Sequence, residues 1–214
     1  MNNNARILIA DDHRLVAELC ARLLGKDFDV VGTVDDGRAL VCAAGTLKPD
    51  VIVLDIAMPV LNGLAAGRQV KQMLPAVKLV YLTMNSDVQV AAEAFECGAS
   101  SYLLKTCATS ELLLAVQQAL RGETYVSKAM SRDTIDSLRW QHKELVNEDK
   151  RLTDRQREVL QLLAEGKAPK EIAGILHLSH RTVAFHKYRI MEVLGATSVA
   201  ELVRYAVRNH IAAA

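Results

Sequence analysis

The chain contains 214 residues, of which 50% are hydrophobic and 24% are charged. These proportions are typical of folded domains and exclude a disordered or low-complexity chain, and no apolar run reaches the roughly 18 residues that a membrane span needs. Residues 1–127 carry 11 basic and 14 acidic side chains (net −3), whereas residues 128–214 carry 15 and 11 (net +4). We therefore expect two domains with different partners, of which the second is the candidate for binding a polyanion.

The first 126 residues alternate short apolar runs with amphipathic stretches. The runs have the length and β-branched content of strands, and the amphipathic stretches have the period of helices. Five strands alternating with five helices predict an α/β domain, with a doubly wound five-stranded parallel sheet over residues 5–126. The predicted strands are 7–10, 28–34, 51–54, 78–82 and 101–104, and the predicted helices are 14–24, 37–47, 62–74, 87–97 and 110–121.

The pattern becomes purely helical from residue 151 to residue 211. Thr153–Gln156 and Ser198–Glu201 have the sequence of capping boxes, each at the start of an apolar stripe. Four helices with short turns predict an all-α helix-turn-helix domain. Residues 127–150 are highly charged and show no strand pattern, so we expect an interdomain linker that is partly helical.

Polar side chains follow the predicted strands at their carboxyl ends. Asp11 and Asp12 follow the first strand, Asp55 the third, Thr83 the fourth and Lys105 the fifth. In a doubly wound sheet these ends meet at one crevice. Crowded carboxylates raise one another's pKa unless a cation joins them, and their hard oxygens suit Mg²⁺. A hydroxyl and a lysine beside this cluster predict a site where a carboxylate attacks a phosphoryl group in line.

Four short motifs, three of which contain Asp11, Asp12, Asp55 or Lys105, support a family resemblance. They are Ile9–His13 (IADDH), Val53–Pro59 (VLDIAMP), Asn62–Gly63 and Tyr102–Lys105 (YLLK). In them, residues 5–122 resemble the receiver domain of bacterial response regulators, which has a flavodoxin-like fold. The resemblance implies that the chain is a phosphoacceptor rather than an enzyme, with a sensor histidine kinase as partner.

The receiver resemblance also implies a role for each residue of the crevice. Asp55 would accept the phosphoryl group, and Thr83 and Lys105 would contact it. Mg²⁺ would be held by Asp11, Asp12, Asp55 and the carbonyl of Ala57. Thr83 and Tyr102 would be the switch residues that respond to phosphorylation.

The second domain carries motifs of its own at 152–160, 170–173 and 181–186. In these motifs, residues 152–210 closely resemble the DNA-binding domain of LuxR/NarL-type (FixJ-type) regulators. A helix is predicted over about 180–194, and over residues 180–189 its polar face is basic and free of acids. Such a face suits insertion into the major groove of double-stranded promoter DNA. The residues expected at the DNA are Lys170, Arg181, Thr182, Ala184, Phe185, His186, Lys187, Tyr188 and Arg189.

Individual contacts in this helix follow from the same resemblance. Thr182 and Lys187 are expected to contact phosphates, whereas Arg181, Ala184, Phe185 and Tyr188 would face or border the bases. Ala184 and Phe185 offer apolar contact with a thymine methyl group rather than hydrogen bonds.

The sequence therefore predicts a cytoplasmic, phosphorylation-controlled transcription regulator without a membrane partner, which forms a homodimer when phosphorylated or bound to DNA. One alternative is a phosphatase of the haloacid-dehalogenase type, but such enzymes need an acid two residues after the nucleophile, where this chain has Ala57. A second alternative is a DNA-binding protein whose receiver responds to a ligand instead of phosphate. We further expect phosphate to shift Thr83, Tyr102 and the surface of 87–97 and 110–121, and so either to release the basic helix from the receiver or to favour dimerisation.

Overall fold

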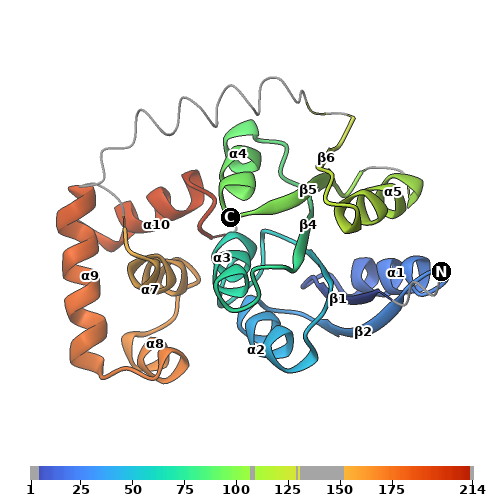
Figure 1. Cartoon of the computed structure of the whole chain (residues 1–214). Coiled ribbons are helices and arrows are strands. Elements are labelled where there is room, and N and C mark those ends of the chain that lie inside the picture. Colours follow the sequence, from blue (N-terminus) through green and yellow to red (C-terminus); the bar gives the residue numbers. More distant parts are fainter. Residues whose placement is uncertain (1–4, 107–108, 129, 131–151, 213–214) are drawn as a thin grey trace.

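The computed structural model describes residues 5–106, 109–128, 130 and 152–212. They form an α/β domain, residues 5–130, and a helical domain, residues 152–212, which lie side by side (Figure 1). The linker predicted over 127–150 falls mostly outside the described residues. Of its described part, Ser127 is buried and donates its backbone N–H to the carbonyl of Tyr102 at 2.9 Å.

The α/β domain is built on a parallel sheet with strand order β2-β1-β3-β4-β5-β6, which confirms the predicted fold class. It has six strands instead of the expected five. The sixth strand has only two residues, too few to show a periodic pattern, and is recognised by its pairing with Ser101 and Tyr102. The strands are β1 Arg6–Ala10, β2 Asp29–Val34, β3 Val51–Leu54, β4 Lys78–Thr83, β5 Ala99–Leu104 and β6 Tyr125–Val126.

Helices cover both faces of this sheet, as Figure 1 shows. Alternate residues of β3 point to opposite faces: Ile52 and Leu54 enter one hydrophobic core, whereas Val51 and Val53 enter the other. This two-sided burial explains why β3 is a continuous apolar run. The helices are α1 Arg14–Leu24, α2 Gly37–Leu47, α3 Gly63–Met73, α4 Val88–Glu96 and α5 Thr109–Leu120.

The helical domain has a separate hydrophobic core. Thr153 and Ser198 cap their helices by accepting the backbone N–H of the residue three positions on. Thr153 and Gln156 form the predicted capping box, whereas the carboxylate of Glu201 accepts the N–H of Thr197 instead of that of Ser198. The helices are α7 Asp154–Ala164, α8 Pro169–Leu176, α9 His180–Leu194 and α10 Val199–Arg208. Among the described helices, none combines the length and apolar character needed to cross a membrane.

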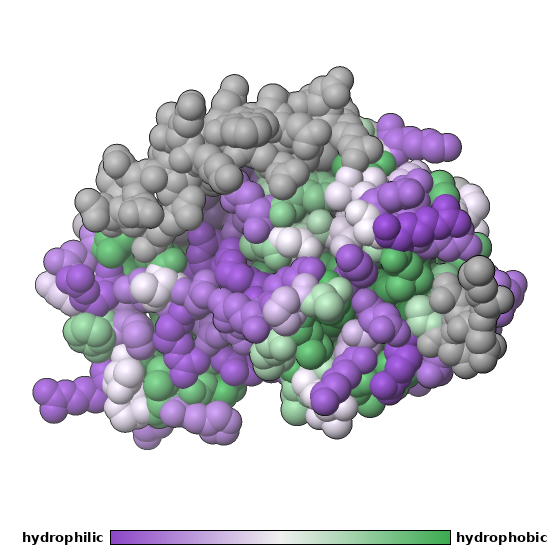
Figure 2. Space-filling view, viewed as in Figure 1, coloured by the Kyte–Doolittle hydropathy of each residue, from purple (hydrophilic) through white to green (hydrophobic). Residues whose placement is uncertain are grey.

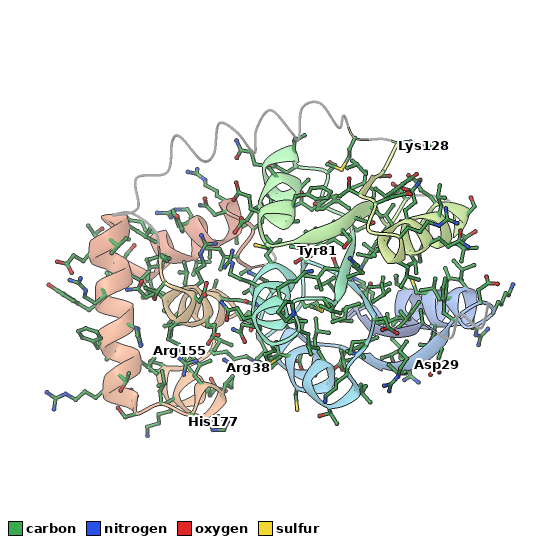
Figure 3. All side chains as sticks on the ribbon, viewed as in Figure 1. Asp29, Arg38, Tyr81, Lys128, Arg155 and His177 are labelled. Carbon is green, nitrogen blue, oxygen red and sulfur yellow. The ribbon has the colours of Figure 1, made fainter. Side chains whose placement is uncertain are left out.

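The junction between the two domains is polar and is built around Glu158 of α7. The Glu158 carboxylate is buried and accepts from Arg38 of α2 at 2.9 Å, from Gln69 of α3 at 2.8 Å and from Arg155 at 2.6 Å. Figure 3 shows Arg38 and Arg155 close together at this junction, and Figure 2 shows mainly hydrophilic residues along it on the visible face. Because a buried charge is costly unless its partners are in place, these bonds favour the docked arrangement of this structure.

Candidate functional site

The acidic crevice forms because the register of the sheet aligns the carboxyl ends of neighbouring strands. Ala10 of β1 pairs with Leu54 of β3, so Asp11 and Asp55 emerge next to each other. Both side chains are almost fully buried, at 4% and 2% exposure. The ligand atoms of Asp11, Asp12, His13 and Asp55 all lie within 4.8 Å of one another. The structure thus brings Asp55 together with two carboxylates, Asp11 and Asp12, that lie more than 40 positions earlier in the sequence.

Lys105 joins two of these carboxylates from the end of β5. Its ammonium group lies 2.8 Å from Asp11 Oδ2 and 2.7 Å from Asp55 Oδ2. Burial works to raise the pKa of Asp11 and prevails over the opposing effect of the hydrogen bond from Lys105. Burial also works to lower the pKa of Lys105, but the hydrogen bonds and charges of the two carboxylates outweigh it and raise that pKa. The lysine therefore stays protonated beside Asp55.

The donor set of the crevice fits a divalent cation. Three carboxylates against one ammonium group leave a formal charge of −2, and all the donors except His13 are oxygens. Ala57, whose carbonyl was expected to be a ligand, is exposed and lines the same cavity as Asp55. Hard oxygen ligands with open positions for water are the set that Mg²⁺ prefers.

The close approach of α3 to the end of β3 explains the Asn62–Gly63 motif. A Cβ atom on Gly63 would lie 1.9 Å from the carbonyl oxygen of Asp55, so any larger residue would push α3 away from the end of β3. Asn62 caps α3 by accepting the N–H of Ala65 at 2.9 Å. The motif lets a helix begin directly against the candidate phosphoacceptor.

The two candidate switch residues both bond to Asn85, which sequence reasoning did not single out. The Thr83 hydroxyl accepts the backbone N–H of Asn85 at 3.2 Å, and the Tyr102 hydroxyl donates to its carbonyl at 2.9 Å. Burial, with smaller effects from the charges of Asp87 and Asp55, raises the pKa of Tyr102, so its phenol remains a donor. Asn85 could have been identified from the sequence only by its position, two residues after Thr83 in a polar loop.

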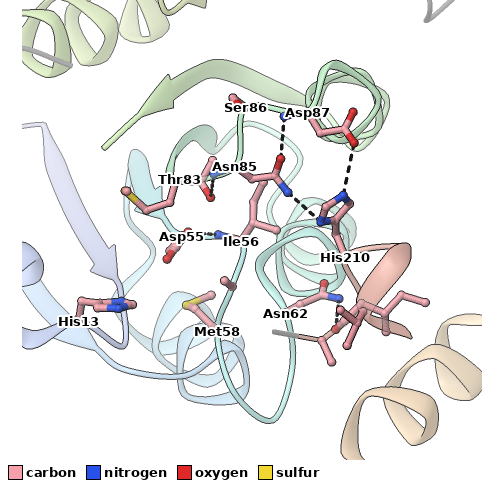
Figure 4. A pocket seen from close by; sticks show the side chains of 15 residues that line it. His13, Asp55, Ile56, Met58, Asn62, Thr83, Asn85, Ser86, Asp87 and His210 are labelled. Carbon is pink, nitrogen blue, oxygen red and sulfur yellow. Dashed lines mark hydrogen bonds and ion pairs between the residues drawn. The ribbon is translucent and has the colours of Figure 1, made fainter. Parts of the chain in front are cut away.

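A cavity of about 700 Å³ opens over Asp55 and is shared by both domains. The α/β domain contributes Asp55, Thr83 and the loop from Met84 to Asp87, and the helical domain contributes residues of its C-terminal end (Figure 4). This end of the chain lies over the crevice edge of the sheet (Figure 1). The contributing residues are Val207, His210, Ile211 and Ala212.

The residues expected at the DNA gather on α9, together with Lys170 at the start of α8. Ser179 caps α9 by accepting the N–H of Thr182 at 3.0 Å, while Val183 and Ile190 face the domain core. Phe185 and Tyr188 are 59% and 68% exposed, unusual values for large aromatic side chains. Of the residues expected at the DNA, six are exposed: Lys170, Arg181, Ala184, Phe185, Tyr188 and Arg189. The other three, Thr182, His186 and Lys187, are partly exposed.

This basic helix lies on the side of the helical domain that faces away from the α/β domain (Figure 1). Within the described residues, α7, the following Glu165 and residues 210–211 make the hydrogen bonds that join the domains. Of the two routes that the sequence left open, release of the basic helix from the receiver does not apply to this structure, because α9 already faces away from the receiver. The contacts that join the described parts of the two domains were not indicated by sequence patterns.

Comparison with known proteins matches both domains to known families. Residues 7–117 match the family described as "Response regulator receiver domain", and residues 150–206 match "Bacterial regulatory proteins, luxR family". The chain is 34% identical over 213 residues to "Oxygen regulatory protein NreC" of Staphylococcus haemolyticus, covering 96% of this chain and 98% of that protein.

Solved structures show the same similarity. The RcsB response regulator of Salmonella typhimurium aligns with a TM-score of 0.63 at 26% identity, over 95% of this chain and 96% of that chain. RcsB from Salmonella enterica serovar Typhimurium, bound to promoter rprA in the presence of phosphomimetic BeF3−, aligns with a TM-score of 0.61 at 28% identity, over 95% and 98% of the two chains.

Proposed function

The chain belongs to the response regulators that join a receiver domain to a LuxR-family DNA-binding domain, and we propose that Asp55 is its phosphoacceptor and α9 its DNA-reading helix. The observation that carries this proposal is the convergence of Asp11, Asp55 and Lys105 within hydrogen-bonding distance at the end of the sheet. The same chain presents an exposed basic helix elsewhere. Together, the two sites make a regulator of transcription controlled by phosphorylation.

In the proposed reaction, a carboxylate oxygen of Asp55 attacks the phosphorus atom of a phosphohistidine on a sensor kinase. The P–N bond breaks, and its electron pair leaves with the imidazole of the donor. Lys105 neutralises charge on the phosphoryl oxygens, and the Ile56 N–H, which donates to Asp55 Oδ1 at 2.6 Å, holds the carboxylate in position. Mg²⁺, held by Asp11, Asp12, Asp55 and the Ala57 carbonyl, would supply further charge neutralisation.

The same residues support a phosphoacceptor over a phosphatase. A phosphatase needs an acid near the nucleophile to protonate its leaving group, and Ala57 has no ionisable side chain. Of the two carboxylates beside Asp55, Asp11 is bound to Lys105 and Asp12 lies 2.8 Å from Nδ1 of His13. We therefore propose that the chain does not turn over a substrate and that any loss of its phosphoryl group belongs to the signalling cycle.

On DNA, we propose that α9 enters the major groove of a promoter and that two copies of the chain read two half-sites. A single helix-turn-helix domain buries little DNA surface, and dimers with half-sites one helical turn apart are usual for such domains. RcsB, whose structures include "two RcsB dimers bound to two parallel DNAs", provides a precedent among similar chains. A protein that acts on promoter DNA and receives phosphate from a kinase belongs in the cytoplasm.

The test is phosphorylation of the full chain by acetyl phosphate, followed by intact-mass measurement. Wild type should gain the mass of one phosphoryl group with Mg²⁺ and none with EDTA, because the carboxylates need a cation to approach the donor. Asp55→Ala should gain nothing. Asp27→Ala is the matched control and should behave as wild type. Asp27 is an exposed acid just before β2, whereas the crevice lies at the carboxyl ends of the strands.

An equal gain of mass in Asp55→Ala would show that another residue is the phosphoacceptor. No gain in wild type, with acetyl phosphate or with a kinase, would favour the second alternative, a receiver that responds to a ligand.

A further inference from the structure

All of the polar groups of Asn85 are bonded, and together they connect the crevice to the helical domain. Its backbone N–H and carbonyl bond to Thr83 and Tyr102, as described above. Its side-chain oxygen accepts the N–H of Asp87 at 2.7 Å, and its side-chain nitrogen lies 3.0 Å from Nδ1 of His210 (Figure 4). Asn85 is therefore bonded at once to the crevice, to its own loop and to a residue 125 positions away.

These contacts define the tautomer of His210. Because the amide oxygen of Asn85 is taken by the Asp87 N–H, its NH₂ group donates to His210, and Nδ1 must be the unprotonated ring nitrogen. The proton is then on Nε2, which lies 3.4 Å from Oδ2 of Asp87. We call these two contacts the His210 clasp. The clasp holds a residue of the helical domain between two residues of the loop that follows Thr83.

The chain around His210 is built to reach this position. His210 has a left-handed backbone, with φ of 53°, which turns the chain after α10 toward the crevice. The carbonyl of Ile211 accepts from the Asn62 side chain at 3.1 Å, and Ile211 itself is buried at 4% exposure. His210 and Ile211 thus form a wall of the cavity into which Asp55 faces.

A phosphoryl group on Asp55 would compete with this arrangement. It adds about −1.5 to −2 charges by analogy with other phosphorylated side chains and attracts nearby donors, of which the Thr83 hydroxyl lines the same cavity. If Thr83 turns to the phosphoryl group, its oxygen leaves the N–H of Asn85, and the residue that carries the clasp loses one of its restraints. Conversely, an intact clasp holds Asn85, and through it Thr83, away from Asp55.

On the premise that Asp55 is the phosphoacceptor, we propose that His210 is a positioning residue that slows phosphoryl transfer to Asp55. Through Asn85, the clasp keeps the Thr83 hydroxyl and the loop after β4 in their unphosphorylated arrangement. Closure of the clasp and phosphorylation of Asp55 therefore oppose each other, and by thermodynamic reciprocity each weakens the other to the same extent. The helical domain senses the state of the crevice by direct contact and not through a distant surface.

The first test compares rates of phosphorylation of the full chain by acetyl phosphate with Mg²⁺. His210→Ala should react about threefold to tenfold faster than wild type, the range that one hydrogen bond commands. His210→Gln should stay close to wild type, because an amide again offers one acceptor and one donor. His177→Ala is the matched control, since His177 also has a left-handed backbone (φ 52°) in the helical domain but lies far from the crevice (Figure 3).

A Thr83→Ala background separates positioning from simple opening of the cavity wall. If the clasp acts through Thr83, His210→Ala should have no further effect on the rate in this background. A full effect there would contradict the proposed route. Equal rates in wild type and His210→Ala would overturn the proposal, whereas no phosphorylation of wild type would overturn the proposed function on which it rests.

A second measurement needs no destabilising substitution. Ring resonances of isotopically labelled histidine are recorded in wild type, with the His210 signals assigned by their absence in His210→Gln. Adding Mg²⁺ with the phosphoryl analogue beryllofluoride should shift the His210 signals and leave those of His177 in place. Unchanged His210 signals, with beryllofluoride bound, would overturn the proposal.

Discussion

The acidic crevice and the basic face of α9 are organised in opposite ways. In the crevice, Asp11, Asp55 and Lys105 are buried and bonded to one another before any phosphoryl group arrives. On α9, Phe185 and Tyr188 are largely exposed. A chemical site must hold its groups in place, because orientation determines reactivity, whereas a DNA-reading face gains its partners only on binding. The crevice should therefore govern stability, and the face should govern affinity for DNA.

Lys105→Met should have the largest effect, because it leaves two buried carboxylates without their cation. We expect a loss of about 3 kcal/mol in the free energy of unfolding, typical of breaking a buried ion pair. Mg²⁺ at millimolar concentration should restore part of it by replacing the lost charge. Urea unfolding with Mg²⁺ or EDTA measures both effects, and Lys26→Met, at an exposed lysine, should change neither. If Lys105→Met lowered the free energy of unfolding by less than about 0.5 kcal/mol, the effect typical of a surface substitution, the ion pairs of the crevice would not govern stability.

Glu158→Gln should weaken the docking of the two domains without unfolding either. The substitution removes the charge that binds both Arg38 and Arg155 at the junction, at a cost of about 2 kcal/mol for hydrogen bonds to a charged group. Small-angle scattering should show a larger radius of gyration. Glu192→Gln, at an exposed glutamate of α9, should leave the radius unchanged. An unchanged radius in Glu158→Gln would show that other contacts hold the domains together.

Lys187→Ala should weaken binding to all DNA duplexes by a similar factor while leaving the free energy of unfolding within about 0.5 kcal/mol of wild type. A lost phosphate contact should also flatten the plot of log affinity against log salt by about 0.9. Titrations of an operator and an unrelated duplex at several salt concentrations measure both. An altered sequence preference with an unchanged salt slope would contradict the role of a phosphate contact.

Phe185→Ala should have the opposite effect to Lys187→Ala, on sequence preference and not on salt dependence. Phe185 is apolar and exposed, so its loss should change which bases are preferred while the salt slope stays the same. Selection of binding sites from random duplexes, compared between variant and wild type, shows the preference. If the variant and wild type selected identical sites, Phe185 would not be a residue that contacts the bases.

The smallest expected effect is a pH dependence from His186. Burial, with help from the charge of Arg155, lowers the pKa of His186. Because the folded state disfavours the proton, this contribution to stability is complete above the unfolded pKa of about 6.5 and is lost as the pH falls through the lower folded value. Protonation over the same range adds a positive charge to the DNA face and should strengthen DNA binding.

His186→Asn should remove both changes with pH, and His177→Asn, at an exposed histidine of the same domain, should retain them. Unfolding and DNA titrations between pH 7 and the acid limit of folding measure them. A pH dependence that survives in His186→Asn would have to come from another group.

Much of the crevice was predictable because the residues that form it occupy regular positions. Strands with continuous apolar runs imply a parallel sheet, and a parallel sheet brings the residues after its strands to one edge. Asp11, Asp55, Thr83 and Lys105 therefore reach the same crevice without any knowledge of the loops. The basic polar face of α9 could be read from the sequence in the same way, whereas the assignment of individual residues to the DNA came from the family resemblance. Val183 and Ile190 form the buried side of this helix.

Asn85 and His210 could not be found in this way. Each lies in an irregular segment, where neither a period of 2 nor a period of 3.6 predicts the direction of a side chain. Their bond also depends on how two domains dock, which in turn rests on the buried carboxylate of Glu158, a residue that looks like any other polar position of an amphipathic helix.

From its sequence alone, the chain specifies an α/β domain with an acidic crevice and a helical domain with a basic helix, because local periodicity and strand-end chemistry are encoded within short segments. The tertiary structure alone establishes that α9 faces away from the receiver and that His210 lines the cavity over Asp55. These features arise from contacts between residues about 100 or more positions apart, such as Arg38 with Glu158 and Asn85 with His210. Such contacts form only when the complementary donors and acceptors of two folded surfaces meet.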